Sequence, residues 1–186
     1  MTDISKLGDF GLIDRLTKDI KPKNDSTIYG VGDDCAVLNY PDTRVLTTTD
    51  MLMEGVHFDL VYTTLKHLGY KAAMVNLSDV FAMNGRPRQL LVSIAVGRRT
   101  CIEDLDERYA GMRLACDKYG VAIVGGATTS SVTGLALSIT CIGKAPAEEV
   151  VGRDGAKDTD LICVSGNRVA ADMNLLIQER EKTGFE

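Results

Sequence analysis

The chain has 186 residues, 45% of them hydrophobic, which is enough to bury a core as one domain or as one domain with the start of another. Its 21 basic and 26 acidic residues give a net charge of -5 without a Lys- or Arg-rich block, which argues against nucleic acid and anionic membranes as partners. Five cysteines without a C-x-x-C pair, no apolar leader and no long apolar run predict a cytoplasmic protein with free thiols.

The first quarter of the chain predicts a helix followed by a β-hairpin. Apolar residues at helical spacing after Asp9 predict an amphipathic helix over residues 10–19. Two strand-like runs follow at residues 35–39 and 44–49, joined by a turn that contains Pro and Asp. The second run closes on three threonines and an aspartate, which places hydroxyls and a carboxylate at the end of a strand.

The middle of the chain alternates helix and strand patterns. Helical spacing predicts helices over residues 65–83 and 102–119. Continuous apolar runs predict buried strands at residues 90–96, 121–124 and 135–142.

A polar, turn-rich segment at residues 145–160 predicts a domain boundary. We assign residues 1–145 to an N-terminal domain, and residues 146–186 to a linker and the start of a second domain. The strand expected at residues 161–166 and the helix expected at 169–182 are too little chain to bury a core of their own. The chain is therefore expected to end shortly inside that second domain.

Two adjacent carboxylates, Asp33 and Asp34, stand in a glycine turn just before an apolar strand. Adjacent negative charges repel each other unless a cation is near, so the turn indicates a divalent metal, although an ordinary solvated turn has the same pattern. Other oxygen-bearing side chains also stand at predicted element ends: Thr48, Thr49, Asp50 and Asp79. Such a set suits a hard cation such as Mg2+, which neutralises and orients phosphates for phosphoryl transfer.

The common phosphate-binding and zinc motifs are missing from the sequence. It contains neither a Walker A motif nor a Rossmann glycine motif after a strand. A glycine turn predicted at residues 125–129 could approach a phosphate through backbone N–H groups, or could simply connect two buried strands. His57 and His67 lack zinc-spaced companions, and we interpret His57 as a ligand contact.

Seven motifs follow one another in order between about residues 8 and 165: Gly8-Asp9-Phe10-Gly11-Leu12-Ile13, Gly32-Asp33-Asp34-Cys35-Ala36, Thr48-Thr49-Asp50, Glu54-Gly55-Val56-His57-Phe58, Gly69-Tyr70-Lys71-Ala72, Asn76-Leu77-Ser78-Asp79 with Ala82-Met83, and Gly125-Gly126. Together they resemble thiamine-monophosphate kinase, in a superfamily with aminoimidazole ribonucleotide synthetase and selenophosphate synthetase. The resemblance implies an α/β (α+β) fold with a mixed or antiparallel sheet and helices packed on one face.

The resemblance also implies a function: ATP-dependent phosphorylation of thiamine monophosphate to thiamine diphosphate by a homodimer, with ATP and Mg2+ near the dimer interface. The residues implied to bind Mg2+ are Asp34, Thr48, Thr49, Asp50 and Asp79. The residues implied to contact ATP are Thr49, Tyr109, Gly126 and Arg153, and His57 is implied to contact the substrate. The helical spacing of Tyr109 suits a core position equally well.

Two features depart from the family pattern. Ala127 replaces the metal-binding Asp of the family's glycine turn, and because a methyl group cannot bind Mg2+, one metal is expected to be lost or weakened, and ATP affinity with it. The family also continues into a C-terminal domain that completes the active site, so this chain by itself is expected to be inactive or nearly so. The alternatives are a non-catalytic nucleotide-binding or dimerisation module, and a superfamily member acting on another phosphoryl acceptor.

Overall fold

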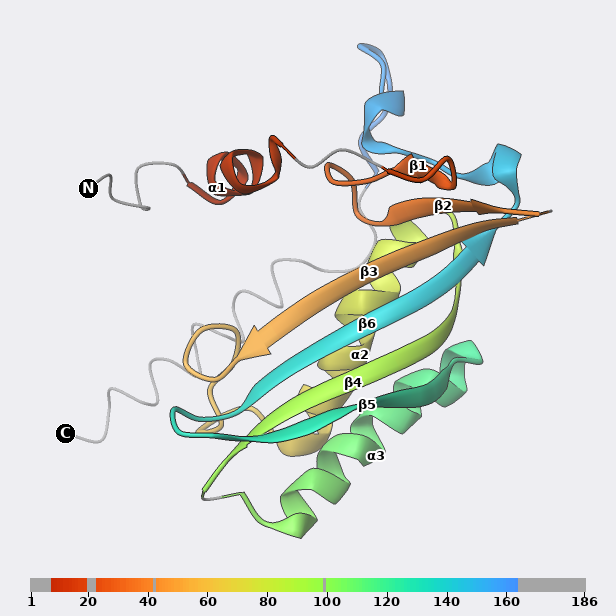
Figure 1. Ribbon diagram of the computed structural model, residues 1–186. Helices are drawn as coiled ribbons and strands as arrows, with labels where there is room; N and C mark the ends of the chain where they lie inside the picture. Colours follow the sequence, from red (N-terminus) through yellow and green to blue (C-terminus); the bar gives the residue numbers. More distant parts are fainter. Residues whose placement is uncertain (1–7, 20–22, 42, 99, 164–186) are drawn as a thin grey trace.

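The computed structural model describes residues 8–19, 23–41, 43–98 and 100–163. A six-stranded sheet runs in the order β1-β2-β3-β6-β4-β5; β4 and β5 are parallel and the other neighbours are antiparallel (Figure 1). The strands are β1 (Thr27–Tyr29), β2 (Ala36–Tyr40), β3 (Thr43–Met53), β4 (Arg86–Gly97), β5 (Ala122–Ser131) and β6 (Ala136–Ala145).

Two long helices, α2 (Leu65–Ala82) and α3 (Ile102–Tyr119), cover one face of this sheet (Figure 1). Alternate residues of the strands point toward them and form the core, because successive strand side chains face opposite sides of a sheet. The core-facing strand residues include Leu46, Leu52, Leu90, Val92, Leu137 and Ile139. The structure thus confirms an α/β fold with a mixed sheet and helices on one face.

Two glycines let α2 and α3 pack backbone against backbone. A Cβ atom at Gly69 would lie 1.9 Å from the carbonyl oxygen of Arg108, and one at Gly111 would lie 1.9 Å from that of Lys66. No side chain fits at either position, so the helices approach closely, and Arg108 is held where they meet.

The helix predicted at residues 102–119 is confirmed with the same bounds. Asp104 accepts a hydrogen bond from the Cys101 N–H at 3.0 Å and closes the first turn. Gly120 ends the helix with a left-handed φ of 66°, which costs a glycine little. The first helix, α1 (Gly8–Thr17), begins and ends two residues before the predicted span, and its Ile13 and Leu16 are exposed.

Two strands differ from the prediction in ways that bear on the site. Strand β3 continues to Met53 because β6 pairs with it from Arg44 to Met53, so Thr48, Thr49 and Asp50 lie inside a strand and not at its end. Residues 125–129 form part of β5 and not a turn, because β4 pairs with them in parallel register. A Cβ atom at Gly126 would lie 1.8 Å from the Val92 carbonyl oxygen, so this glycine permits close pairing of strands.

The segment after β6 contains two short 3-10 helices, η2 (Ala147–Glu149) and η3 (Arg153–Gly155). Residues 161–163 form no strand, contrary to the prediction, and Leu161 and Ile162 are exposed. The rest of that predicted strand and the helix predicted at 169–182 lie outside the described residues. In the described part of the chain, none of the helices combines the length and apolarity that crossing a membrane requires.

Candidate metal and nucleotide site

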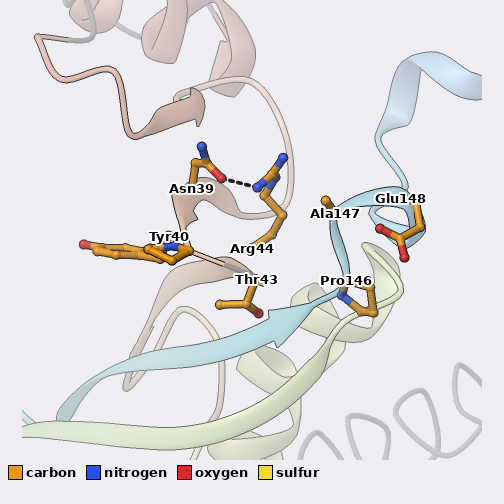
Figure 2. Close-up of a pocket in the computed structure, with 8 residues that line it drawn as sticks. Asn39, Tyr40, Thr43, Arg44, Pro146, Ala147 and Glu148 are labelled. Carbon is orange, nitrogen blue, oxygen red and sulfur yellow. Dashed lines mark hydrogen bonds between the residues drawn. The ribbon is translucent and has the colours of Figure 1, made fainter.

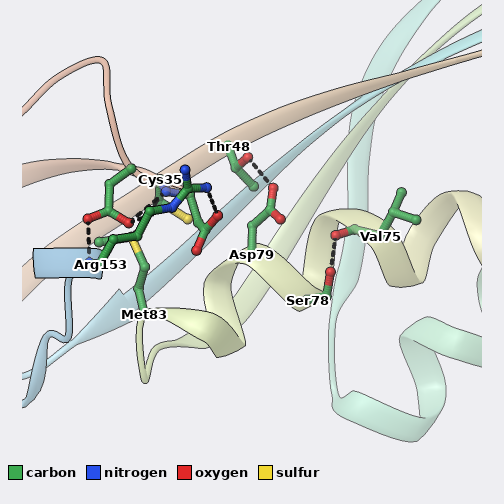
Figure 3. A network of polar contacts seen from close by, with 9 residues as sticks. Cys35, Thr48, Val75, Ser78, Asp79, Met83 and Arg153 are labelled. Carbon is green, nitrogen blue, oxygen red and sulfur yellow. Dashed lines mark hydrogen bonds and ion pairs between the residues drawn. The ribbon is translucent and has the colours of Figure 1, made fainter. Parts of the chain in front are cut away.

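The candidate site is a group of oxygen-bearing side chains between β3 and the last turns of α2. The Thr48 hydroxyl donates a hydrogen bond to Asp79 Oδ2 at 2.6 Å (Figure 3). Thr48 and Asp50 lie two residues apart on β3, on the same side as the core residues Leu46 and Leu52. The sheet therefore directs both polar side chains toward α2.

Asn76 of α2 contacts the backbone of β3: its Oδ1 accepts a hydrogen bond from the Asp50 N–H at 3.0 Å, and its Nδ2 donates to the Ala72 carbonyl at 3.1 Å. Asn76 is 1% exposed, so it is a fully buried polar group with partners on both sides. It fixes the position of Asp50 relative to Asp79, one helical turn further along α2.

The Gly-Asp-Asp turn reaches the same region and pairs with Arg153. Asp33 Oδ2 accepts from the Arg153 N–H at 3.0 Å, and the Arg153 side chain forms ion pairs with Asp33, at 3.7 Å, and with Asp34. The Asp33 side chain is 15% exposed and that of Asp34 is 27% exposed, against 53% for Arg153. One guanidinium thus balances part of the charge of two adjacent carboxylates. Figure 3 shows Arg153 beside Cys35.

Asp79 is held in an environment that disfavours its charged form. Burial raises the pKa of Asp79, and the charges of Asp50 and Asp34 raise it further, while the hydrogen bond from Thr48 and the charge of Arg153 lower it. The charges of Asp34, Asp50 and Arg153 therefore all influence the protonation of Asp79.

Cys35 is a buried, neutral thiol next to these carboxylates. Its N–H donates to the Met83 Sδ at 3.1 Å, which ties the Gly-Asp-Asp turn to the end of α2. Burial, followed by the charge of Asp79, raises the pKa of Cys35 to about 12. The thiol therefore contributes packing and not a reactive nucleophile at neutral pH.

The composition of the cluster fits Mg2+, which prefers carboxylate and hydroxyl oxygens and retains water. The half-buried Asp79, whose pKa is raised by burial and by neighbouring carboxylates, is a group that an added cation would stabilise in its charged form. As arranged, however, the described residues contain no group of three His, Cys, Asp or Glu side chains close enough to hold a metal. The metal-binding roles of Asp34, Asp50 and Asp79 therefore stay a prediction.

The other residues predicted to bind ligands lie away from this cluster. Gly126 is on β5, separated from β3 by β6 and β4, which corresponds to about 14 Å across the sheet. Tyr109 lies on α3, half-buried against the core. Thr49 points to the face of the sheet without helices, where its hydroxyl donates to the Ile139 carbonyl and accepts from Thr140.

His57 lies in the turn that follows β3. Its Nδ1 accepts a hydrogen bond from the Met53 N–H at 3.0 Å, and its carbonyl accepts one from Lys71 Nζ at 2.8 Å. The imidazole is exposed, and its contact with the substrate stays a prediction.

A surface hollow of about 480 Å3 opens beside the β2–β3 hairpin, where Asn39, Tyr40 and Arg44 face Pro146 and Glu148 (Figure 2). Arg44 donates to Asn39 Oδ1 within it. None of the predicted ligand-binding residues lines this hollow, so we do not assign it to the candidate site.

Residues 32–145 match the family described as AIR synthase related protein, N-terminal domain. The chain belongs to this family. The matched range contains the Gly-Asp-Asp turn, β3, α2 and the whole sheet from β2 to β6. It therefore includes the carboxylate cluster, which consists of Asp33, Asp34, Asp50 and Asp79, but not Arg153.

This AIR synthase related chain is similar to thiamine-monophosphate kinases. It is 36% identical over 181 residues to that of Aquifex aeolicus (strain VF5), covering 96% of this chain and 56% of the relative. To that of Bacillus subtilis (strain 168) it is 34% identical over 157 residues, covering 83% and 48%. The solved structure of AaThiL complexed with AMPPCP and TMP superimposes with a TM-score of 0.83 and 35% identity, covering 96% of this chain and 55% of that one. The chain spans about half the length of the curated relatives it matches.

Sequence reasoning did not assign roles to two buried polar residues, Asn76 and Arg108. Asn76 stands three residues before Asp79, and this helical spacing already places both side chains on one face of α2. Arg108 interrupts the apolar face of α3 between Leu105 and Met112. In both cases, a polar residue on the buried side of an amphipathic helix could have indicated a functional or structural role.

Proposed function

We propose that the protein is an ATP-dependent kinase that phosphorylates thiamine monophosphate to thiamine diphosphate, and that this chain supplies the part that binds Mg2+ and ATP. The observation that carries the proposal is the carboxylate cluster between β3 and α2, where Thr48 is bonded to Asp79 and Asp34 is paired with Arg153. The similarity to AaThiL complexed with AMPPCP and TMP supports the identity of both substrates.

In this proposal Asp34, Asp50 and Asp79 hold Mg2+, with the hydroxyl oxygen of Thr48 beside them, whereas the Thr49 hydroxyl faces the other side of the sheet. When bound, Mg2+ neutralises phosphate charge and orients the transferred group, and phosphoryl transfer needs no covalent nucleophile from the protein. Asn76 positions Asp50 through its backbone N–H, which keeps the carboxylates in register. The neutral Cys35 thiol keeps one wall of the site apolar.

Arg153 is proposed to serve two partners in turn. Without a bound cation, its guanidinium balances Asp33 and Asp34. When Mg2+ takes over that balance, Arg153 is free to pair with an ATP phosphate, for which the guanidinium fork is well suited. Gly126 and Tyr109 are the further ATP contacts, and the exposed imidazole of His57 contacts the substrate.

We also infer a cytoplasmic homodimer. One chain leaves Gly126 of β5 about 14 Å from β3, and a second copy offers another way to bring a β5 to the carboxylate cluster. The sheet face without helices exposes Met51 and Met53, apolar area of the kind that a partner covers. The five cysteines are free, as expected in a reducing compartment.

The test is a comparison of phosphoryl acceptors with the full-length protein. We expect Mg2+ and ATP to convert thiamine monophosphate to thiamine diphosphate, measured by chromatography, and to leave aminoimidazole ribonucleotide precursors unchanged. Preference for the latter would overturn the assignment in favour of another superfamily member.

A second candidate function, a non-catalytic nucleotide-binding or dimerisation module, is favoured by Ala127. Its partner on β4 is the exposed Ser93, so the methyl group stands on the sheet face without helices. If this position faces a metal, Ala127→Asp should raise Mg-ATP affinity about tenfold, measured by calorimetry with and without Mg2+. An unchanged affinity would rule out a metal at position 127.

A further inference from the structure

Arg108 of α3 is a buried cation with two guanidinium nitrogens that lack a hydrogen-bond partner among the described residues. The residue is 2% exposed, and neither its Nε nor its Nη1 has a hydrogen-bond partner among the described residues. A guanidinium stays charged and offers its N–H donors in a fixed fork. Burying such donors without acceptors is unfavourable, so a bound ligand that supplies acceptor oxygens would be stabilising.

Arg108 is one of the residues that line a cavity of about 480 Å3, a volume within the roughly 300–1,000 Å3 typical of small-molecule sites. It is lined by residues of the β4–α3 connection, by the first turns of α3, by the turn from β5 to β6, and by Glu54 and Leu60 from the segment after β3. The lining residues that matter here are Glu54, Leu60, Arg98, Asp104, Arg108 and Leu135.

The two carboxylates in the cavity wall are already engaged elsewhere. Glu54 Oε2 accepts from the Leu135 N–H at 2.8 Å, and Asp104 Oδ2 accepts from the Cys101 N–H at 3.0 Å. Burial lowers the pKa of Arg108, while the charges of Asp104 and Glu54 act against that shift. These carboxylates therefore help to keep Arg108 protonated without satisfying its Nε and Nη1.

We propose that this cavity binds the oxyanion group, phosphate or carboxylate, of a small organic molecule, with Arg108 as the main donor. Arg98 adds a second cation at the wall, and Leu60 and Leu135 provide apolar surface for the organic part of the ligand. The site is separate from the carboxylate cluster: Glu54, the residue after β3, stands six residues beyond Thr48, which corresponds to about 20 Å of extended chain.

The test uses two simple anions, inorganic phosphate and malonate, titrated calorimetrically into the protein without Mg2+ at low ionic strength. We expect saturable binding of at least one, and which anion binds more tightly tells a phosphate site from a carboxylate site. Arg108→Gln should weaken that binding at least about tenfold, as expected when charge-assisted hydrogen bonds are lost. Arg113→Gln, at an exposed position of the same helix, should leave it within about twofold.

Failure of both anions to bind, or equal affinities of Arg108→Gln and Arg113→Gln, would overturn the proposal. If Arg108→Gln does not fold, NMR of the wild-type protein provides a second test. The Nε–H resonance of Arg108 is assigned by comparison with Arg108→Lys, in which this resonance is absent. We expect this resonance to shift on titration with the anion that binds. A resonance that stays in place at saturation would contradict a direct contact.

Discussion

At the scale of single residues, burial disfavours the charged forms of two groups in the site. Asp79 and Cys35 lie in one neighbourhood, and burial raises the pKa of both groups. For Asp79 the Thr48 hydrogen bond opposes this effect, so the carboxylate is poised to gain from a cation. The Cys35 thiol, by contrast, stays neutral throughout the physiological range.

Cys141 gives a prediction about stability at high pH. Burial raises the pKa of Cys141 to about 12, while a thiol in an unfolded chain titrates near 8.5. Between these values the unfolded state releases a proton that the native state keeps, so the free energy of unfolding falls as pH rises, by up to about 1.4 kcal/mol per unit. Cys141→Ala should therefore show a shallower loss of stability between pH 8.5 and 10.5.

Urea unfolding at several pH values measures this effect. Cys141→Ala should also cost about 1–2 kcal/mol at pH 7, because it removes a buried sulfur. Cys163→Ala, which removes an exposed thiol, is the control and should keep the wild-type slope. Equal slopes in wild type and Cys141→Ala would show that the buried thiol does not titrate as expected.

At the scale of elements, local signals predicted the helices better than the strands. The ends of α3 depend on Asp104 and Gly120, each of which lies close in sequence to the end that it caps, and both ends were predicted at the correct residues. The extents of β3 and β5 depend on pairing with β6 and β4, which are distant in the chain. The two adjacent glycines, Gly125 and Gly126, therefore led to the prediction of a turn, whereas pairing with β4 makes these residues part of a strand.

Adjacent glycines of β5 provide a matched test of that strand. At Gly126 the φ is 153° and a Cβ atom would lie 1.8 Å from the Val92 carbonyl oxygen, whereas at Gly125 the nearest atom is the Leu91 Cδ2 at 3.8 Å. Gly126→Ala should destabilise the protein by about 3 kcal/mol or more, and Gly125→Ala by less than about 1 kcal/mol. Chemical unfolding followed by circular dichroism measures both, and similar losses would contradict the close pairing of β4 and β5.

The candidate site shows the same division between local and long-range information. The sequence singled out Asp34, Thr48, Asp50 and Asp79 by their residue types, and the structure brings Thr48 into contact with Asp79. The pairing of Arg153 with Asp34 joins residues 119 positions apart, so no local pattern predicts it. Its role came only from the family resemblance.

At the scale of the whole molecule, the sheet face without helices is proposed as the dimer interface. Met51 of β3 is 55% exposed on that face. A charge placed there would have to be desolvated on association, so Met51→Lys should shift a dimer toward monomer. Leu114→Lys, at a 53% exposed position of α3, should leave the dimer intact.

Sedimentation at micromolar concentration measures this shift. A monomeric wild type, or equal effects of the Met51 and Leu114 substitutions, would argue against the proposed interface.

The most direct test of the metal-nucleotide site is calorimetry of AMPPCP binding with and without Mg2+, in wild type and Asp79→Asn. The asparagine keeps the acceptor for Thr48 but removes the charge that a cation needs, while Asp117→Asn, at an exposed position on α3, controls for loss of charge alone. We predict that Mg2+ strengthens wild-type binding at least about tenfold and that Asp79→Asn abolishes this gain. The same Mg2+ dependence in Asp79→Asn and wild type would contradict the assignment of the carboxylate cluster as a magnesium-nucleotide site.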